Sequence, residues 1–131
     1  MSKLRCTCGH VIRDQADQLP YKGHLFKDQD KEVVLEGIAS DVSLYIKSLL
    51  GEEKEEWIEQ FPWLQGKEHS AVLWGIITQY CLKYPVNLYE CRICGRLWVQ
   101  QGVKSQEFLS YVPEHPGIGT MLQSEQYNRA D

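Results

Sequence analysis

The chain has 131 residues, with 14 Lys and Arg against 18 Asp and Glu, and a formal net charge of −4. This length fits one domain and is enough to bury a hydrophobic core. The contents of 43% hydrophobic and 24% charged residues exclude a disordered or collagen-like chain, and the acidic balance disfavours a strongly basic nucleic-acid binder. The five cysteines are the unusual part of the composition, since four of them form two close pairs and Cys81 stands alone.

The N-terminal segment and the apolar runs bear on localisation. Residues 1–6 contain no apolar stretch of the kind that a secretory signal peptide needs. The longest apolar run, residues 71–77, is far shorter than the ~20 residues that span a bilayer. We therefore expect a cytoplasmic protein with no membrane association. In that reducing compartment, paired cysteines are metal ligands more often than disulfides.

The N-terminal 29 residues predict two short strands and a loop. Residues 1–13 have the pattern of two strands joined by a turn at Cys8 and Gly9, where the glycine permits the positive φ of a tight turn. Residues 14–29 show no clear hydrophobic period, so we predict a loop.

Residues 30–61 predict two helices. In the first, apolar residues recur at spacings of three and four and share one face: Val34, Ile38, Val42, Tyr45 and Leu49. Gly51 stands where a glycine commonly ends a helix. The second helix is acidic and is expected from Glu52 to about Phe61, because Pro62 stops it.

A third helix is expected over residues 68–83. It is apolar nearly all round, and a helix of that kind is usually buried. We therefore place it at the centre of the fold and expect Cys81 to be a core cysteine.

After Pro85 the pattern changes to that of β-strands. Residues 88–91 and 96–100 predict two strands around a turn at Cys94 and Gly95, and residues 107–112 predict a third.

The two cysteine pairs have the spacing of metal ligands. They lie in the segments Cys6-Thr7-Cys8-Gly9 and Cys91-Arg92-Ile93-Cys94-Gly95. In such a turn two thiolates bind one ion, backbone amides hydrogen-bond the sulfurs, and the glycine lets the chain curl beneath the metal. Two turns together complete a tetrahedral site, for which thiolates favour Zn²⁺, with iron as the alternative. Because the first pair is one residue shorter than Cys-x-x-Cys, His10 is a substitute ligand for either of its cysteines.

The two motifs resemble the zinc ribbon, a group of small domains in which cysteine turns on separate β-hairpins hold one zinc ion. The resemblance covers roughly residues 4–13 and 88–100. It implies a structural zinc ion bound by Cys6, Cys8, Cys91 and Cys94. The helices then form an insertion between two halves of the ribbon. The expected fold is a single α+β domain: split zinc-ribbon-like hairpins over residues 1–28 and 85–113, a three-helix insertion over residues 29–84, and an irregular tail over residues 114–131.

Buried free thiols and a redox Cys-x-x-Cys motif are the alternatives to a metal site. The polar, turn-like surroundings of the cysteines disfavour the first. The second is disfavoured because redox motifs lie at a helix N-terminus, whereas the sequence after Cys94 is strand-like. Four cysteines close the coordination shell, and no His-x-Glu or His-Glu-x-x-His pairing accompanies them. We therefore expect a structural metal and no enzymatic activity.

Charge is unevenly distributed along the chain. Residues 1–28 carry a net charge of +2, residues 29–70 carry −6, and residues 71–131 carry none. The acidic middle contains tryptophans, a combination typical of a docking surface for a basic partner. The residues predicted for this surface are Glu52, Glu53, Glu56, Trp57 and Trp63. The alternative is an ordinary solvated helix face.

Three hypotheses of function follow. The leading one is a zinc-stabilised, non-enzymatic protein-binding module, for example an immunity or antitoxin protein that neutralises a basic partner. The second is association with nucleic acid in transcription or translation, through a small basic face that includes Trp98: Arg5, Arg13, Arg92, Arg96 and Lys104. The third is a thiol- or metal-based enzyme, which would need an open coordination position.

Overall fold

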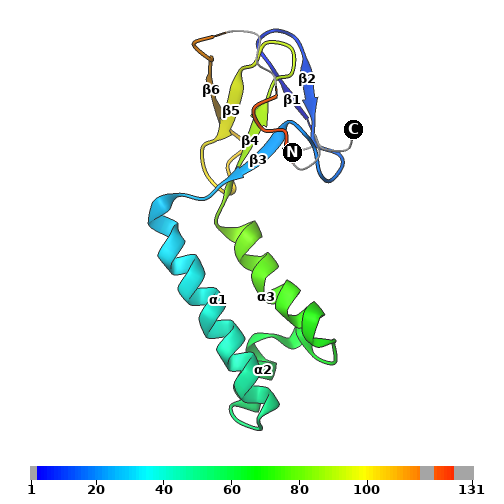
Figure 1. The fold of residues 1–131 in the computed structure, drawn as a ribbon, viewed down its shortest axis with the longest axis vertical. Coiled ribbons are helices and arrows are strands. Elements are labelled where there is room, and N and C mark those ends of the chain that lie inside the picture. Colours follow the sequence, from blue (N-terminus) through cyan, green and yellow to red (C-terminus); the bar gives the residue numbers. More distant parts are fainter. Residues whose placement is uncertain (1–2, 116–119, 126–131) are drawn as a thin grey trace. The chain divides into compact units, whose positions relative to one another are not determined.

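The structure is a computed structural model that describes residues 3–115 and 120–125 (Figure 1). The described residues form helices and antiparallel strands, which confirms the predicted α+β class. Along the chain the elements are β1 (Lys3–Arg5), β2 (Val11–Arg13), β3 (Lys22–Leu25), α1 (Asp28–Leu49), α2 (Lys54–Gln60), the 3-10 helix η1 (Pro62–Leu64), α3 (His69–Lys83), β4 (Val86–Glu90), β5 (Leu97–Gln100) and β6 (Phe108–Tyr111).

The chain divides into two compact units. Residues Met1–Leu25 and Val86–Asp131 form one, which we call the β unit, and Phe26–Pro85 form the other, the helical unit. The chain leaves the β unit after Leu25 of β3 and returns to it at Val86 of β4. These two residues lie opposite each other in the β3-β4 pair. Within the described residues, no helix has the length and apolar character needed to cross a membrane.

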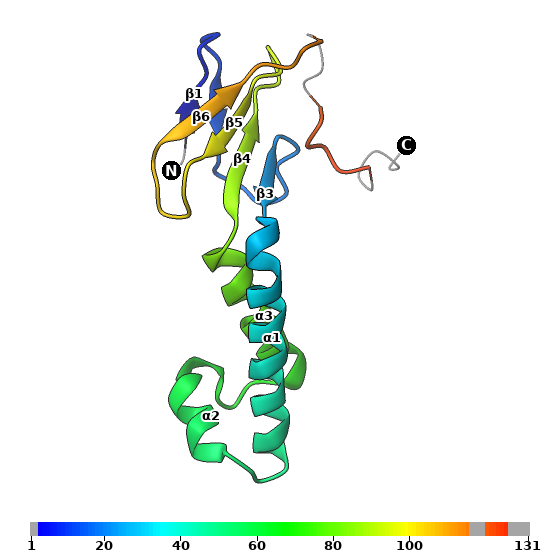
Figure 2. The same cartoon turned by 90° about the vertical axis from the view of Figure 1, so that its left-hand side faces the viewer.

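The β unit contains a two-stranded sheet, β1-β2, and a four-stranded sheet in the order β3-β4-β5-β6 (Figures 1 and 2). Residues directly opposite each other in adjacent antiparallel strands point to the same face. One face, which we call the inner face, carries Tyr89, Trp98 and Phe108, and these pack with Cys6 and Ile12 of the β1-β2 hairpin. The opposite, outer face carries a row made of Glu90, Leu97 and Tyr111.

The strand β3 is a correction, since residues 14–29 were expected to be a loop. Lys22–Leu25 pairs with β4 over four positions, from Lys22 opposite Tyr89 to Leu25 opposite Val86. The segment has no hydrophobic alternation of its own. Its extended form therefore depends on a partner strand that lies more than 60 residues away in the sequence.

The helical unit has a core of its own. Buried side chains from α1, α2, η1 and α3, and from the residue between α2 and η1, form it: Leu44, Tyr45, Trp57, Phe61, Leu64, Val72 and Ile76. The predicted end of α1 is confirmed, because Gly51 adopts a φ of +86° and its N–H donates to the carbonyl of Ser48. This left-handed residue satisfies a carbonyl of the last helical turn and stops the helix.

The expectation that α3 is buried on all sides is wrong. Val72 and Ile76 are buried, but Trp74 is 76% exposed, Leu82 is 73% exposed, and Cys81 is exposed rather than a core residue. Within the helical unit α3 packs on α1 and η1, so neighbours cover one side of it. A helix is enclosed only where elements pack around its whole circumference, and this unit supplies too few.

A close approach joins α1 to α3 at Gly37. The Tyr80 hydroxyl donates to Asp41 Oδ2 over 2.7 Å, and its ring passes so near Gly37 that a Cβ there would lie 2.6 Å from ring carbon Cε1. Burial and the acceptor Asp41 raise the pKa of Tyr80 to about 12, so this hydroxyl stays a donor at neutral pH. A side chain at position 37 would therefore displace the Tyr80 ring from its place between the two helices.

We predict that Gly37→Ala destabilises the chain by about 1–3 kcal/mol through overpacking against Tyr80, although alanine favours an isolated helix by ~1 kcal/mol. Thermal or urea unfolding measures this. The exposed Ser40→Ala on the same helix serves as the control and should leave stability nearly unchanged. A Gly37→Ala chain as stable as the wild type would contradict the packing described.

Candidate metal centre

Two turns at the ends of strands present the four paired cysteines. Cys6 and Cys8 lie in the turn between β1 and β2, and Cys91 and Cys94 lie in the turn between β4 and β5. Each turn contains a glycine with positive φ, +98° at Gly9 and +77° at Gly95, a conformation that other residues rarely adopt.

The two turns are closed by equivalent hydrogen bonds and differ by one residue. In the first, Cys6 N–H donates to the His10 carbonyl over 2.8 Å, and in the second, Cys91 N–H donates to the Arg96 carbonyl over 2.9 Å. The shorter first motif therefore forms a shorter turn of the same kind. His10 contributes its backbone carbonyl to this closure and does not belong to the sulfur cluster.

The four sulfur atoms lie together. The Sγ atoms of Cys6 and Cys94 are 3.6 Å apart, as are those of Cys8 and Cys91, and all four lie within 4.8 Å of one another. Each of these two close contacts joins one turn to the other. A sulfur separation of 3.6 Å excludes a disulfide, whose bond length is about 2.05 Å. In contrast, a tetrahedral ion with metal–sulfur bonds of about 2.3 Å places its sulfurs about 3.8 Å apart. The cluster can therefore hold one metal ion.

Burial and hydrogen bonding shift the pKa values of two of the four thiols in opposite directions. Burial raises the pKa of Cys6, but hydrogen bonds from the Cys8 backbone N–H and from neighbouring thiols, together with the nearby Trp98 N–H, lower it to about 6. Burial raises the pKa of Cys91 to about 12, against the opposing effect of backbone N–H groups of Cys94 and Ile93. At neutral pH the Cys91 thiol therefore keeps its proton. A metal ion would displace that proton, because thiolates are the form that binds metals.

The indole of Trp98 supports the cluster from the inner face of the sheet. Its Nε1 is buried and makes no hydrogen bond of normal geometry among the described residues, yet its N–H lowers the pKa of Cys6. The indole dipole therefore acts on the Cys6 sulfur at longer range. Donors of this kind stabilise metal-bound thiolates from outside the coordination shell. The sequence suggested Trp98 for nucleic-acid contact and did not indicate this position.

A polar network fixes the chain that links β2 to β3. Asp14 Oδ2 accepts hydrogen bonds from Tyr89 and from Lys22, whose Nζ lies 2.5 Å away. Burial alone would raise the pKa of Asp14, but these donors and the Lys22 charge lower it below its usual value. Burial and the hydrogen bond to Asp14 raise the pKa of Tyr89. Since Tyr89 lies two residues before Cys91, the network ties the N-terminal segment to the second cysteine turn.

Comparison with known proteins identifies the family of the chain. A family model described as "Domain of unknown function (DUF8617)" matches residues 2–115, a segment that contains all four clustered cysteines. The chain belongs to this family. No curated protein matches it, and no solved structure does.

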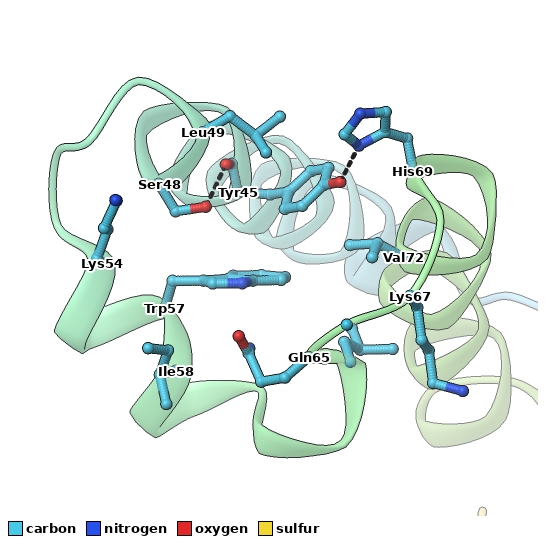
Figure 3. Close-up of a pocket in the computed structure, with 12 residues that line it drawn as sticks. Tyr45, Ser48, Leu49, Lys54, Trp57, Ile58, Gln65, Lys67, His69 and Val72 are labelled. Atoms are coloured by element: carbon cyan, nitrogen blue, oxygen red, sulfur yellow. Dashed lines mark hydrogen bonds between the residues drawn. The ribbon is translucent and has the colours of Figure 1, made fainter.

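The partner surface predicted for this DUF8617 chain is only partly exposed. Trp57 is 5% exposed, and its ring lies 5.0 Å from that of Tyr45 and 4.7 Å from that of Phe61. Figure 3 shows its indole across the middle of a cavity of about 280 Å³, with Tyr45 and Ser48 on one side and Gln65 on the other. Trp57 is therefore a core residue of the helical unit and is not exposed for docking in this structure. Trp57 and Phe61 are one helical turn apart in the sequence, and this spacing already indicates that both side chains lie on one buried face.

The other predicted surface residues lie at the surface of the helical unit. Glu52, Glu53 and Glu56 are exposed, and Trp63 is 54% exposed. Glu53 lies 4.0 Å from Lys47, and Glu53 and Glu56 line one small polar cavity with Asp41. Trp63 lines a different cavity, of about 650 Å³, together with Trp74. The exposure of Trp74 was not anticipated, because α3 was expected to be buried.

We predict that Asp14→Asn lowers the free energy of unfolding by about 1–2 kcal/mol at pH 7, because it removes a charge-assisted acceptor. Since the folded-state pKa of Asp14 is lowered, its contribution is complete above the usual carboxyl pKa of ~3.9 and is lost as the pH falls through the lower folded-state value. Urea unfolding of wild type and variant between pH 7 and pH 3 measures the difference.

The exposed Asp17→Asn is the matched control for charge, and its effect should be near zero at every pH. Acid release of a bound metal affects both variants alike, so it cancels in the comparison. An Asp14→Asn effect that stays constant down to pH 3 would show that the carboxylate charge is not the source of the stabilisation.

Proposed function

We propose that the chain is a zinc-stabilised, non-enzymatic protein-binding module with a split zinc-ribbon-like β unit, and that its helical unit docks a basic protein. The cluster of four sulfurs from both turns is the observation that supports zinc stabilisation. The docking of a basic protein is supported by the acidic charge of residues 29–70 and by the exposed tryptophans of the helical unit.

The geometry favours Zn²⁺ as the ion and a structural role for it. Four thiolates at tetrahedral spacing satisfy the coordination preference of zinc and leave no position for water or substrate. Iron in a similar sulfur environment is the alternative. Because a closed shell offers no site for a reacting ligand, we propose that the metal acts on folding and that the chain is not an enzyme.

A basic protein is the partner that suits the helical unit. Glu52, Glu53 and Glu56 offer exposed carboxylates close in sequence to Trp63, and exposed tryptophans commonly contribute the strongest contacts of an interface. Acidic surfaces also steer oppositely charged proteins toward productive encounters. A basic toxic effector is one such partner, and it would make the chain an immunity or antitoxin protein.

Nucleic-acid association is the weaker alternative. Trp98 packs in the core of the β unit and Arg96 donates to Ser110 Oγ over 3.2 Å. Arg92 lies over the ring of Tyr21, with 5.6 Å between guanidinium carbon and ring centroid. Three of the residues considered for this face therefore already have intramolecular contacts, and the partly buried Trp98 offers less of its ring for a base to stack on.

We predict about one zinc per chain in protein purified without chelators, since one tetrahedral site takes four ligands. When cobalt replaces the metal, the absorption spectrum should show the thiolate-to-cobalt bands of a tetrahedral site. Cys91→Ser should lose the metal and lower the free energy of unfolding by at least ~3 kcal/mol, because metal binding is coupled to folding. Cys81→Ser is the matched control, since Cys81 lies outside the cluster. Metal-free wild-type protein, or equal stability of the two variants, would contradict the structural zinc site.

We predict that the immobilised, metal-loaded chain retains a protein of net positive charge from a lysate of its source cells, and that about 0.5 M salt releases it because charge pairs are screened. The double variant Glu52→Gln, Glu56→Gln should retain at least about tenfold less. The double variant Glu32→Gln, Glu36→Gln on α1 carries the same charge change and is the control. Equal loss in both variants would refute the proposed surface, and retention of nucleic acid alone would favour the alternative.

A further inference from the structure

The outer face of the four-stranded sheet carries an apolar cavity with one carboxylate in it. The cavity measures about 270 Å³, and its walls come from β4, the turn before β5, β5, β6 and the chain beyond: Glu90, Gly95, Leu97, Tyr111, Val112, Pro113 and Met121. Glu90, Leu97 and Tyr111 are register partners in adjacent strands, so one row of the sheet forms the floor. A rigid sheet therefore fixes the position of the carboxylate.

Glu90 is only 2% exposed, and its charge is not balanced within the described part of the chain. Oε1 accepts the backbone N–H of Leu122 over 3.0 Å. In residues 3–115 and 120–125 no hydrogen bond is made to Oε2, and no Lys or Arg nitrogen lies within 4.0 Å of the carboxylate. Glu90 is itself one of the residues that line the cavity. The carboxylate thus presents one oxygen to the cavity that it lines.

A buried carboxylate without a counter-charge is costly, and apolar walls increase that cost. Four of the lining side chains, Leu97, Val112, Pro113 and Met121, offer neither a donor nor a charge. The fifth, Tyr111, offers an aromatic ring that attracts cations. The chemistry that matches this cavity is a positive charge carried on an apolar stem.

We infer that this cavity is a binding site for a primary ammonium on an aliphatic chain, the chemistry of a lysine side chain or a free alkylamine. A single free oxygen suits the compact ammonium, whereas a guanidinium binds best with its two-donor fork on both oxygens of a carboxylate. A divalent metal ion is unsuited to the site, because Ca²⁺ and Mg²⁺ need about six oxygen ligands. The site lies in the β unit and does not depend on the acidic docking surface proposed for the helical unit.

The test is a titration of the full, metal-loaded chain with n-butylammonium chloride at low salt, followed by backbone amide NMR shifts. Shifts are expected at Leu97, Tyr111 and Val112, and n-butanol should bind at least about tenfold more weakly, since it lacks the charge. A second titration uses a lysine that is blocked at its α-amino and carboxyl groups and keeps its side-chain ammonium free. It distinguishes a protein side chain from a free amine as the ligand. If the blocked lysine binds as well, the site takes a protein side chain, and if only butylammonium binds, it takes a free amine.

Glu90→Gln keeps the acceptor for Leu122 and removes the charge, so it should weaken butylammonium binding at least about tenfold. Glu107→Gln, at an exposed carboxylate of the same unit, should leave binding unchanged. Because Glu90 precedes Cys91, the metal content of Glu90→Gln is measured as well. Val112→Trp fills the cavity from an exposed position, leaves Glu90 in place and should abolish binding. Absence of shifts in the wild type, or wild-type affinity in either Val112→Trp or a metal-loaded Glu90→Gln, would overturn the inference.

Discussion

The contact between two cysteine turns that lie far apart in the sequence is the constraint on which the β unit depends. Cys8 and Cys91 are separated by 83 residues, yet their sulfurs lie 3.6 Å apart. Chain-entropy arguments give a cross-link closing a loop of this length about 4–5 kcal/mol of stabilisation. A metal ion held by four thiolates acts as such a cross-link. Without it, the β1-β2 hairpin of three-residue strands would depend on a small core in which Cys6 and Cys91 are themselves buried.

The place of the helical unit in the sequence follows from the same geometry. It starts after Leu25 and ends before Val86, which are opposite residues in the β3-β4 pair. An insertion whose two ends leave adjacent strands adds little to the strain of the host sheet, and the entropy of closing a loop grows only slowly with its length. The helical unit also has its own buried aromatic cluster. The β unit and the helical unit can therefore carry different tasks, with the proposed metal site in one and the proposed docking surface in the other.

Local patterns in the sequence predicted the parts of the structure that local chemistry decides. The cysteine turns, the end of α1 at Gly51 and the helix stop before Pro62 each depend on a few neighbouring residues, so spacing was enough to find them. Strand β3 was missed because pairing with distant β4 makes it extended. The apolar sequence of α3 gave no information on how many neighbours surround it, so the exposure of Trp74 and Cys81 was not foreseen. The carboxylate of Glu90 was overlooked for a similar reason, since only the register of three strands places it among apolar side chains.

The charge of the proposed metal site accounts for basic residues around it. A divalent ion on four thiolates carries a net charge of −2, which must be stabilised in a partly buried position. Backbone N–H groups of Cys8, Ile93 and Cys94 and the indole of Trp98 point dipoles at the sulfurs, and Arg92 follows directly after one of the four cysteines. Basic side chains near the cysteines thus have a structural reason that needs no nucleic acid, whereas residues 29–70 of the helical unit keep a net charge of −6. This asymmetry is the physical basis for looking for a basic partner at the helical unit.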